Sequence, residues 1–351
     1  MSVVEAEVRT ATFLKRALKD GSKFVNPVPT PLGGPGLMFK VLPEMLFGQS
    51  QREPKSAIGP FRTDPAIYLR PPASGLRITW FGHSSSLIEM DGVRVLTDPV
   101  WDERASPLTW AGPKRFFEPT IALESLPKLD AVLISHDHYD HLGEQTARKL
   151  AQLQPAARWI VPLGVGAILL RFGVSARKIT ELDWTDSTHI AGKDTELTVT
   201  SLPARHFSGR SMFHRMETLW ASYTLHGSGH SVYYGADSGY WEGFAEIGAA
   251  HGPFDLTMLE IGAYNDLWQS IHMGPEGAAQ AFRTMAAHGL LMPIHWGLFD
   301  LALHGWQQPI VQMMHIADVE GFRIWSPEPG RPTDVVRGVE LRSDWWKQSP
   351  V

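Results

Sequence analysis

Three histidines and two aspartates lie within eight residues of the chain, in the segment SHDHYDHL (135–142). The apolar run AVLI comes directly before this segment and indicates a buried strand. Residues i and i+2 of an extended segment project to the same side, so His136 and His138 can meet one ion. As the chain turns, Asp140 and His141 can face a second ion. A strand that ends in so many ligand-type side chains predicts a metal site at the edge of a sheet.

Four side chains do not complete a site for two metal ions, so further ligands are expected at other strand ends. Three later strand-like segments finish in suitable residues: TVTSLPARH at His206, SVYYGAD at Asp237 and LLMPIH at His295. Open sheets place their sites at the carboxyl ends of their strands. Each of these residues alone could be a structural polar group, but together with 135–142 they predict one shared centre.

The order of the predicted elements favours a layered α/β fold. Two strand-like segments, LRITWFGHSSSLIEM and VRVLTDPV, flank Asp91-Gly92, which predicts a β-hairpin. Helical patterns at 144–153 and 275–289 alternate with further strands. Hairpins mixed with crossovers are typical of a mixed sheet covered by helices. We therefore expect a main domain over residues 76–351.

Residues 1–75 differ from the main domain and are interpreted as an N-terminal arm that packs on it. A short helix is expected to end near Asp20, before the Pro/Gly-rich segment NPVPTPLGGPG. The apolar stretch LMFKVLPEMLFG (37–48) could contact a membrane or form a lid. Packing against the main domain is the favoured interpretation, because exposed apolar patches are uncommon.

The composition restricts the classes of function. The 351 residues are 43% hydrophobic and 20% charged, which is typical of a soluble globular protein. A formal net charge of −5 argues against a nucleic-acid partner. The absence of cysteine excludes disulfides, thiolate ligands and thiol nucleophiles. With no signal-peptide core and no run near ~18 apolar residues, we expect a cytoplasmic protein, with peripheral membrane contact as the alternative.

The series HDHYDH, His206, Asp237 and His295 resembles the metallo-β-lactamase superfamily. Within it, the chain is most similar to the N-acylphosphatidylethanolamine-hydrolysing phospholipase D group, from about Gly75 to Gln308. The segments that carry this likeness include WFGHSSSLIEMDGVRVLTDPVW, LPKLDAVLISHDHYDHL, GADSGY, IGAY and MPIHWG. The resemblance implies an αββα sandwich with an N-terminal extension and two metal ions between the sheet edges.

The resemblance also implies a ligand for each position of a dinuclear centre. The first metal would be held by His136, His138 and His206, the second by Asp140, His141 and His295, and Asp237 would bridge the two. Zn²⁺ is the expected metal for imidazole and carboxylate ligands, with Fe or Mn as alternatives. A hydroxide that bridges the two ions would be the nucleophile.

Three residues are predicted to act in the reaction: Asp140, which also holds a metal, His272 and His304. His272, in SIHMGPE, matches a functional histidine of the phospholipase D group, and either histidine could supply a proton to the leaving alkoxide. His83 is expected to line the cleft, and Asp98 is expected to accept a hydrogen bond from a ligand histidine.

Glu260, in LEIGAY, departs from the pattern of the group, in which a proline or an apolar residue is expected. It is either a buried, paired carboxylate or an additional polar group that reaches the site. The sequence leaves both alternatives open.

These observations favour a dinuclear-metal hydrolase, and first of all a phosphodiesterase of phospholipase D type that acts on N-acylphosphatidylethanolamine or a similar phosphodiester. The same centre could attack a carbonyl, so a lactonase or another carboxylic-ester or amide hydrolase is the first alternative. A non-catalytic metal-binding protein is an alternative of another class. The expected partner is a small-molecule or lipid phosphodiester, and the resemblance also admits a homodimer.

Overall fold

Two β-sheets packed face to face form the centre of the computed structural model, which describes residues 12–32, 36–211 and 214–348. The strands of the first sheet are, in spatial order, β15 (Thr333–Asp334), β3 (Leu76–Gly82), β4 (Ser85–Met90), β5 (Val93–Thr97), β6 (Ala131–Leu133), β7 (Arg158–Pro162) and β8 (Ile179–Leu182). Those of the second are β14 (Leu290–Ile294), β13 (Leu256–Glu260), β12 (Ser231–Tyr234), β11 (Ser222–His226), β10 (Glu196–Leu202) and β9 (Ser187–Ala191).

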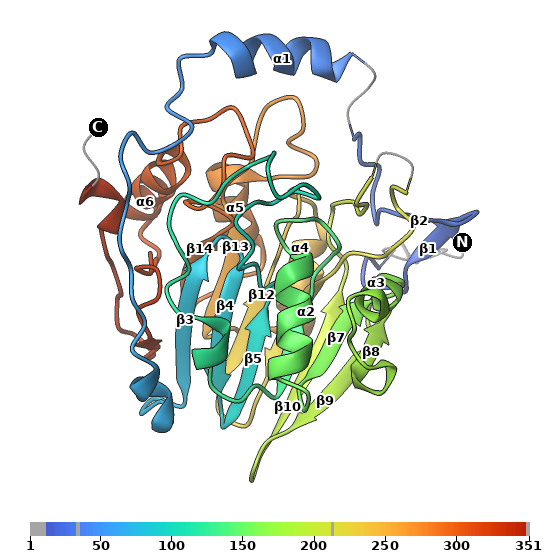
Figure 1. Ribbon diagram of the computed structural model, residues 1–351, viewed down its shortest axis with the longest axis vertical. Helices are drawn as coiled ribbons and strands as arrows, with labels where there is room; N and C mark the ends of the chain where they lie inside the picture. The colour runs from blue at the N-terminus through green and yellow to red at the C-terminus, as the bar shows by residue number, and fades with distance from the viewer. Residues whose placement is uncertain (1–11, 33–35, 212–213, 349–351) are drawn as a thin grey trace, which may run out of the picture.

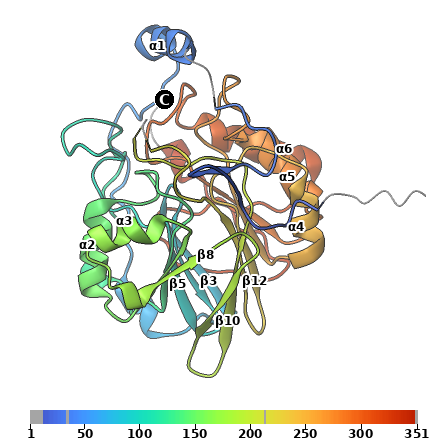
Figure 2. The same cartoon turned by 90° about the vertical axis from the view of Figure 1, so that its right-hand side faces the viewer.

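Helices cover the outer faces of both sheets. The first sheet carries α2 (Glu144–Leu153) and α3 (Val165–Arg171), and the second carries α4 (Gly243–His251), α5 (Gly274–Thr284) and α6 (Gln308–Glu320). Figures 1 and 2 show these helices on the two sides of the paired sheets. The predicted αββα sandwich is therefore confirmed.

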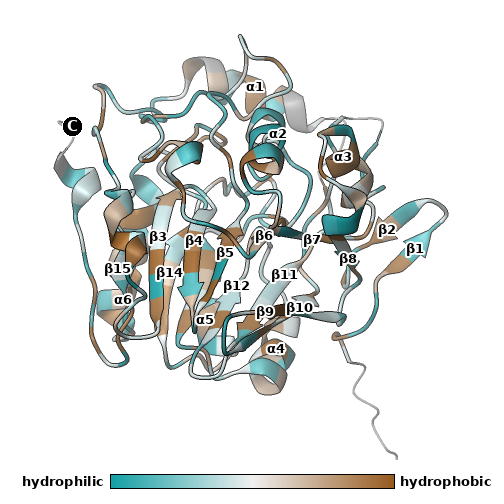
Figure 3. Ribbon diagram, turned by 60° about the horizontal axis from the view of Figure 1, so that its bottom comes forward, coloured by the Kyte–Doolittle hydropathy of each residue, from teal (hydrophilic) through white to brown (hydrophobic). Residues whose placement is uncertain are grey.

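The side chains of β3 show why this strand lies between two apolar layers. Leu76, Ile78 and Trp80 are buried in the cluster that the two sheets share, whereas Phe81 belongs to the cluster under α2 and α3 with Leu150. Successive side chains of a strand point to opposite faces, so a strand covered on both sides must be apolar at almost every position. Figure 3 shows hydrophobic colour on the strands in the interior of the fold.

The directions of the strands bring the candidate ligands to one edge. β5, β6, β7 and β8 run parallel to one another, and so do β12, β13 and β14. β10 is two antiparallel steps away from β12 and therefore has the same direction. The sequence predicts His206, Asp237 and His295 at strand ends. His295 does follow β14 directly, but His206 and Asp237 lie further on, in the loops after β10 and β12.

The predicted hairpin at Asp91-Gly92 is confirmed and lies at the opposite end of the sheets. Met90 pairs with Val93, and both loop residues have positive φ, 49° at Asp91 and 85° at Gly92. This conformation is the one that two-residue hairpins favour. The Asp91 carboxylate also accepts hydrogen bonds from the backbone N–H of Gly229 and from His230, which ties the two sheets together at that end.

The start of the described arm is a hairpin rather than the expected helix. β1 (Leu18–Asp20) pairs with β2 (Lys23–Val25), and residues 12–17 contain no helix. Phe24 of β2 is buried in the main core. Any helix over residues 1–11 lies outside the described residues.

Helix α1 (Leu37–Phe47) lies apart from the rest of the fold, at the top of Figures 1 and 2. The side chains of Phe39 and Phe47 are 82% and 76% exposed. The expectation that this apolar stretch packs on the main domain is therefore wrong for the helix. Among the described residues, no helix combines the length and the apolar character needed to cross a bilayer.

Candidate metal centre

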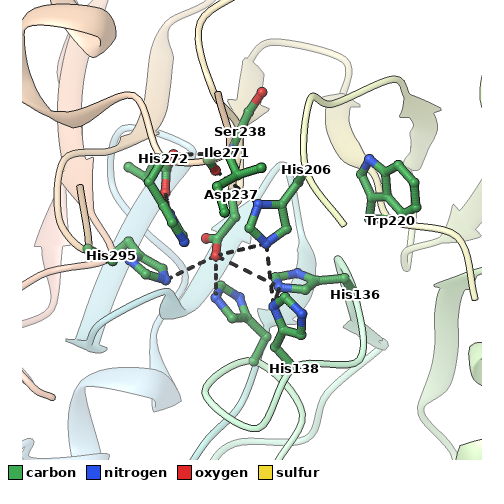
Figure 4. A network of polar contacts seen from close by, with 12 residues as sticks. His136, His138, His206, Trp220, Asp237, Ser238, Ile271, His272 and His295 are labelled. Carbon is green, nitrogen blue, oxygen red and sulfur yellow. Dashed lines mark hydrogen bonds and ion pairs between the residues drawn. The ribbon is translucent and has the colours of Figure 1, made fainter. Parts of the chain in front are cut away.

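The carboxylate of Asp237 lies where the predicted ligands meet. Its Oδ2 atom is 3.1 Å from Nε2 of His295 and 3.2 Å from Nε2 of His141. The same atom is 3.7 Å from Nε2 of His206 and 3.8 Å from Nε2 of His136. Figure 4 shows this carboxylate surrounded by imidazole rings. Asp237 is thus placed to be shared between two groups of ligands.

The first group consists of three histidines that come from both sheets. Nδ1 of His138 lies 2.8 Å from Nε2 of His136 and 3.4 Å from Nε2 of His206. All three nitrogens lie close enough together to bind one ion. The loop after β6 supplies two of these side chains, and the loop after β10 supplies the third.

The second group forms around Asp140. Its Oδ2 atom lies 3.2 Å from Nε2 of His295, 3.5 Å from Nε2 of His141 and 2.9 Å from Nε2 of His83. Burial and the neighbouring His295 lower the pKa of His83 to about 3, so its imidazole is neutral. The structure therefore places His83 as a hydrogen-bond donor to a ligand carboxylate, the kind of contact that orients metal ligands.

The backbone turns sharply where the strands deliver these side chains. His83, Asp98, Ala236 and His295 all have positive φ, at 54°, 34°, 49° and 61°. Each of them follows the end of a strand within two residues. Such conformations cost on the order of 1–3 kcal/mol in non-glycine residues and gather at functional sites. The backbone N–H of His295 also donates to the carbonyl of His83 at 2.9 Å, which joins the two sheets at the centre.

The outer nitrogens of two of the candidate ligand histidines have their own partners. Nδ1 of His141 donates to Asp98 Oδ2 at 2.7 Å, and Nδ1 of His206 donates to the carbonyl of Ile271 at 2.9 Å. Asp98 is fully buried and also accepts a hydrogen bond from the Tyr234 hydroxyl. A proton held on the outer nitrogen leaves Nε2 bare, as a metal ligand requires.

The inner atoms fit a pair of divalent cations. Nε2 of His141, Nε2 of His295 and Oδ1 of Asp237 are buried without a hydrogen-bond partner in the described part of the chain. Burial by itself would lower the pKa of His295, but the Asp237 and Asp140 carboxylates outweigh it and raise this pKa to about 10. Nitrogen and oxygen donors that converge around negative charge match Zn²⁺, Fe or Mn.

Glu260, the last residue of β13, is fully buried beside this centre. Its Oε2 atom lies 2.7 Å from Nδ1 of His272. Its Oε1 atom accepts hydrogen bonds from the backbone N–H groups of Ser238 and Met273, at 3.1 and 3.0 Å. Both alternatives left open by the sequence are observed, because the carboxyl group is buried and paired and it also lies close to Asp237, His272 and His295 in a group of possible metal ligands.

The two remaining candidate histidines have different surroundings. The ring of His272 lies 5.1 Å from that of His206 and 5.2 Å from that of His295, and it points into the centre (Figure 4). His304 instead stacks on Tyr264 at 4.7 Å, and its Nε2 atom is buried without a partner among the described residues. The structure therefore brings His272 to the ligands, while His304 belongs to neither of the two ligand groups.

A family model described as the β-lactamase superfamily domain matches residues 93–296, which span all seven predicted ligands. The chain belongs to the metallo-β-lactamase superfamily. The resemblance seen in the sequence is thus confirmed, and the protein is a metal-dependent hydrolase of this superfamily.

Relatives within the superfamily are found in bacteria and animals. An uncharacterized protein of Mycobacterium tuberculosis is 48% identical over 285 residues, which cover 81% of this chain and 74% of that protein. The N-acyl-phosphatidylethanolamine-hydrolyzing phospholipase D 1 of Caenorhabditis elegans is 37% identical over 234 residues, or 65% of each chain. A metallo hydrolase of Ignicoccus hospitalis shares the fold, with a TM-score of 0.55 and 21% identity over 74% of this chain and 97% of that one.

Proposed function

We propose that the protein is a dinuclear-metal phosphodiesterase of phospholipase D type, with N-acylphosphatidylethanolamine or a similar phosphodiester as its substrate. The observation that carries this proposal is the pair of ligand groups that share Asp237. Two cations held side by side can face both the attacking and the leaving oxygen of a phosphodiester. The similarity to the worm phospholipase D supports the substrate class.

Each side chain of the centre has a defined task in this proposal. The first ion would be held by His136, His138 and His206, the second by Asp140, His141 and His295, and both by Asp237. Zn²⁺ is the proposed metal, with Fe and Mn as alternatives. When bound, the two ions would lower the pKa of a water molecule and polarise a phosphoryl oxygen.

His272 is the proposed proton donor to the leaving group. Its Nδ1 atom is occupied by Glu260, so Nε2 is the ring nitrogen left to face the substrate. In this step His272 starts with a hydrogen on each ring nitrogen, and as the bond between phosphorus and the leaving oxygen breaks, Nε2 gives its proton to that oxygen. The products are a neutral alcohol and an imidazole that keeps its hydrogen on Nδ1. His304 lies with Phe299 and Trp306 around a small cavity that His83 and His295 also line, and it is proposed as the alternative donor.

A product assay by mass spectrometry tests the substrate. The purified protein is incubated with N-acylphosphatidylethanolamine and with a soluble aryl phosphodiester, each with and without a chelator. We expect phosphatidic acid and N-acylethanolamine, and we expect the chelator to stop their release. Cleavage of the soluble diester alone would mean that the natural substrate is a phosphodiester other than N-acylphosphatidylethanolamine. Hydrolysis of carboxylic esters alone would contradict the phosphodiesterase.

We also propose that α1 contacts the surface of a lipid bilayer, because both segments beside the helix are fixed next to the metal centre. On one side, the Ser270 hydroxyl donates to the carbonyl of Pro31 at 2.6 Å, two residues before His272. On the other, the backbone N–H of Trp306 donates to the carbonyl of Gln51 at 3.0 Å. An exposed apolar helix at this place can meet the membrane in which a phospholipid substrate lies.

The double variant Phe39→Ser/Phe47→Ser tests this contact. We expect it to sediment less with phosphatidylcholine–phosphatidylethanolamine vesicles, because the bilayer would no longer bury two exposed rings. Its hydrolysis of a water-soluble diester should be unchanged. Leu69→Ser is the matched control, since Leu69 is 85% exposed and lies at the hairpin end of the sheets. Equal sedimentation of the double variant and the unmodified protein would refute the contact.

A further inference from the structure

We propose that Glu260 is a positioning residue, which holds His272 so that only Nε2 of the imidazole can serve the reaction. This inference rests on the proposed hydrolysis, but it does not depend on which ester is the substrate. The inference assigns a role to Glu260, a residue at a position where the pattern of the phospholipase D group has no carboxylate.

The surroundings of Glu260 show that its carboxyl group is built into a specific set of contacts. The side chain is 0% exposed at the end of a central strand, where an unpaired carboxyl group would be very unfavourable. Two backbone N–H groups, those of Ser238 and Met273, occupy Oε1. Oε2 is left for His272, which it meets at 2.7 Å. The carboxyl group therefore orients this one side chain.

The backbone contacts of Glu260 fix the position of the His272 imidazole as well as its orientation. Met273, which donates to Oε1, directly follows His272 and precedes the first residue of α5. The same carboxyl group thus holds the backbone of this segment and the ring itself. A ring nitrogen that is engaged by a carboxylate keeps its hydrogen, and the other nitrogen is then the one presented to a substrate.

Another role for Glu260 has to be separated from this one. The Ser238 N–H that donates to Oε1 directly follows Asp237, the shared ligand. Loss of the carboxylate could therefore disturb the metal ions instead of His272. The two roles differ in a measurable way, because only the positioning role requires that His272 be present.

The decisive experiment is a double-mutant cycle on the metal-loaded protein with Glu260→Gln and His272→Ala. Glutamine keeps the shape, and its carbonyl can still accept from both backbone donors. Its NH₂ group would donate to Nδ1 of His272, so Nδ1 could no longer hold a hydrogen while Nε2 gives its proton to the leaving oxygen. We expect kcat to fall by about 100-fold in each single variant. KM and the bound metal should change less than twofold.

The combined variant decides between the two roles. If Glu260 acts through His272, adding Glu260→Gln to His272→Ala should cost less than a further twofold in kcat. Multiplied losses in the combined variant, or a loss of metal in Glu260→Gln alone, would overturn the proposal. Failure to cleave phosphodiesters would contradict only the proposed function, because the double-mutant cycle can be measured on any carboxylic ester that the protein hydrolyses. A protein that hydrolyses no ester would overturn both.

A measurement on the unmodified protein determines directly which ring nitrogen of His272 holds the hydrogen. In the zinc-loaded protein labelled with ¹⁵N-histidine, the signals of His272 are assigned by comparison with His272→Ala. We expect a hydrogen on Nδ1. An Nδ1 atom that carries no hydrogen would contradict the orientation by Glu260.

Discussion

Replacing Asp237 with asparagine is expected to lower kcat by more than about 100-fold and to remove metal from the protein. The reason is that Oδ2 of Asp237 lies within 3.8 Å of four imidazole nitrogens from both ligand groups. An amide has almost the same shape, but it carries no negative charge to offset two cations. Turnover of a soluble ester and metal content by mass spectrometry would be measured on the same sample.

Asp91→Asn is the matched control for this variant. The Asp91 carboxylate is also largely buried and hydrogen-bonded, but it lies in the hairpin at the far end of the sheets. We expect this substitution to lower the free energy of unfolding and to leave kcat and metal content within twofold. An Asp237→Asn protein that keeps its metal and more than about a tenth of its turnover would exclude a shared-ligand role.

Removal of the metal is expected to abolish turnover and to lower Tm by about 4 °C or more. A ligand present at 100 times its Kd stabilises the folded state by about 2.7 kcal/mol. An unfolding entropy of about 2.1 cal/mol/K per residue makes 1 kcal/mol correspond to about 1.4 °C in Tm for a chain of 351 residues. In this chain the stabilisation should be concentrated at the edge where both sheets supply ligands. Calorimetry before and after dialysis against a chelator would measure it.

Two comparisons make the stability measurement specific. Addition of Zn²⁺ to the dialysed protein should restore both Tm and turnover. The Asp237→Asn protein should show a smaller change in Tm on chelation, because it holds less metal from the start. An unchanged Tm of the native protein after complete removal of metal would mean that the ligand set is stable without cations.

The convergence of the candidate ligands could be expected from the sequence, because each lies at or shortly after the end of a predicted strand. A segment such as HDHYDH places four of the candidate ligands at a strand end, and the apolar residues before it mark the strand. The helix expected over 144–153 is found at the same bounds, since its apolar positions recur at helical spacing. Such features depend on neighbours in the chain.

Other features depend on residues that are distant in sequence or on the surroundings of a segment. The contact of Glu260 with His272 joins a strand end to the start of a helix twelve residues later, and no periodicity encodes it. The helix expected over 275–289 ends at Thr284, because Ala286 turns to a φ of 48° before β14 begins. The exposure of Phe39 could not be inferred either, since an apolar residue looks the same in a core and on a surface.

The supply of ligands by both sheets has a consequence for how the protein is made in the cell. Chains emerge from the ribosome with the N-terminal part first, so HDHYDH appears well before Asp237 and His295. Until those residues follow, the early histidines have no shared carboxylate opposite them. The complete centre therefore cannot form before His295 has been released from the ribosome, and loading of a second ion would have to wait until then.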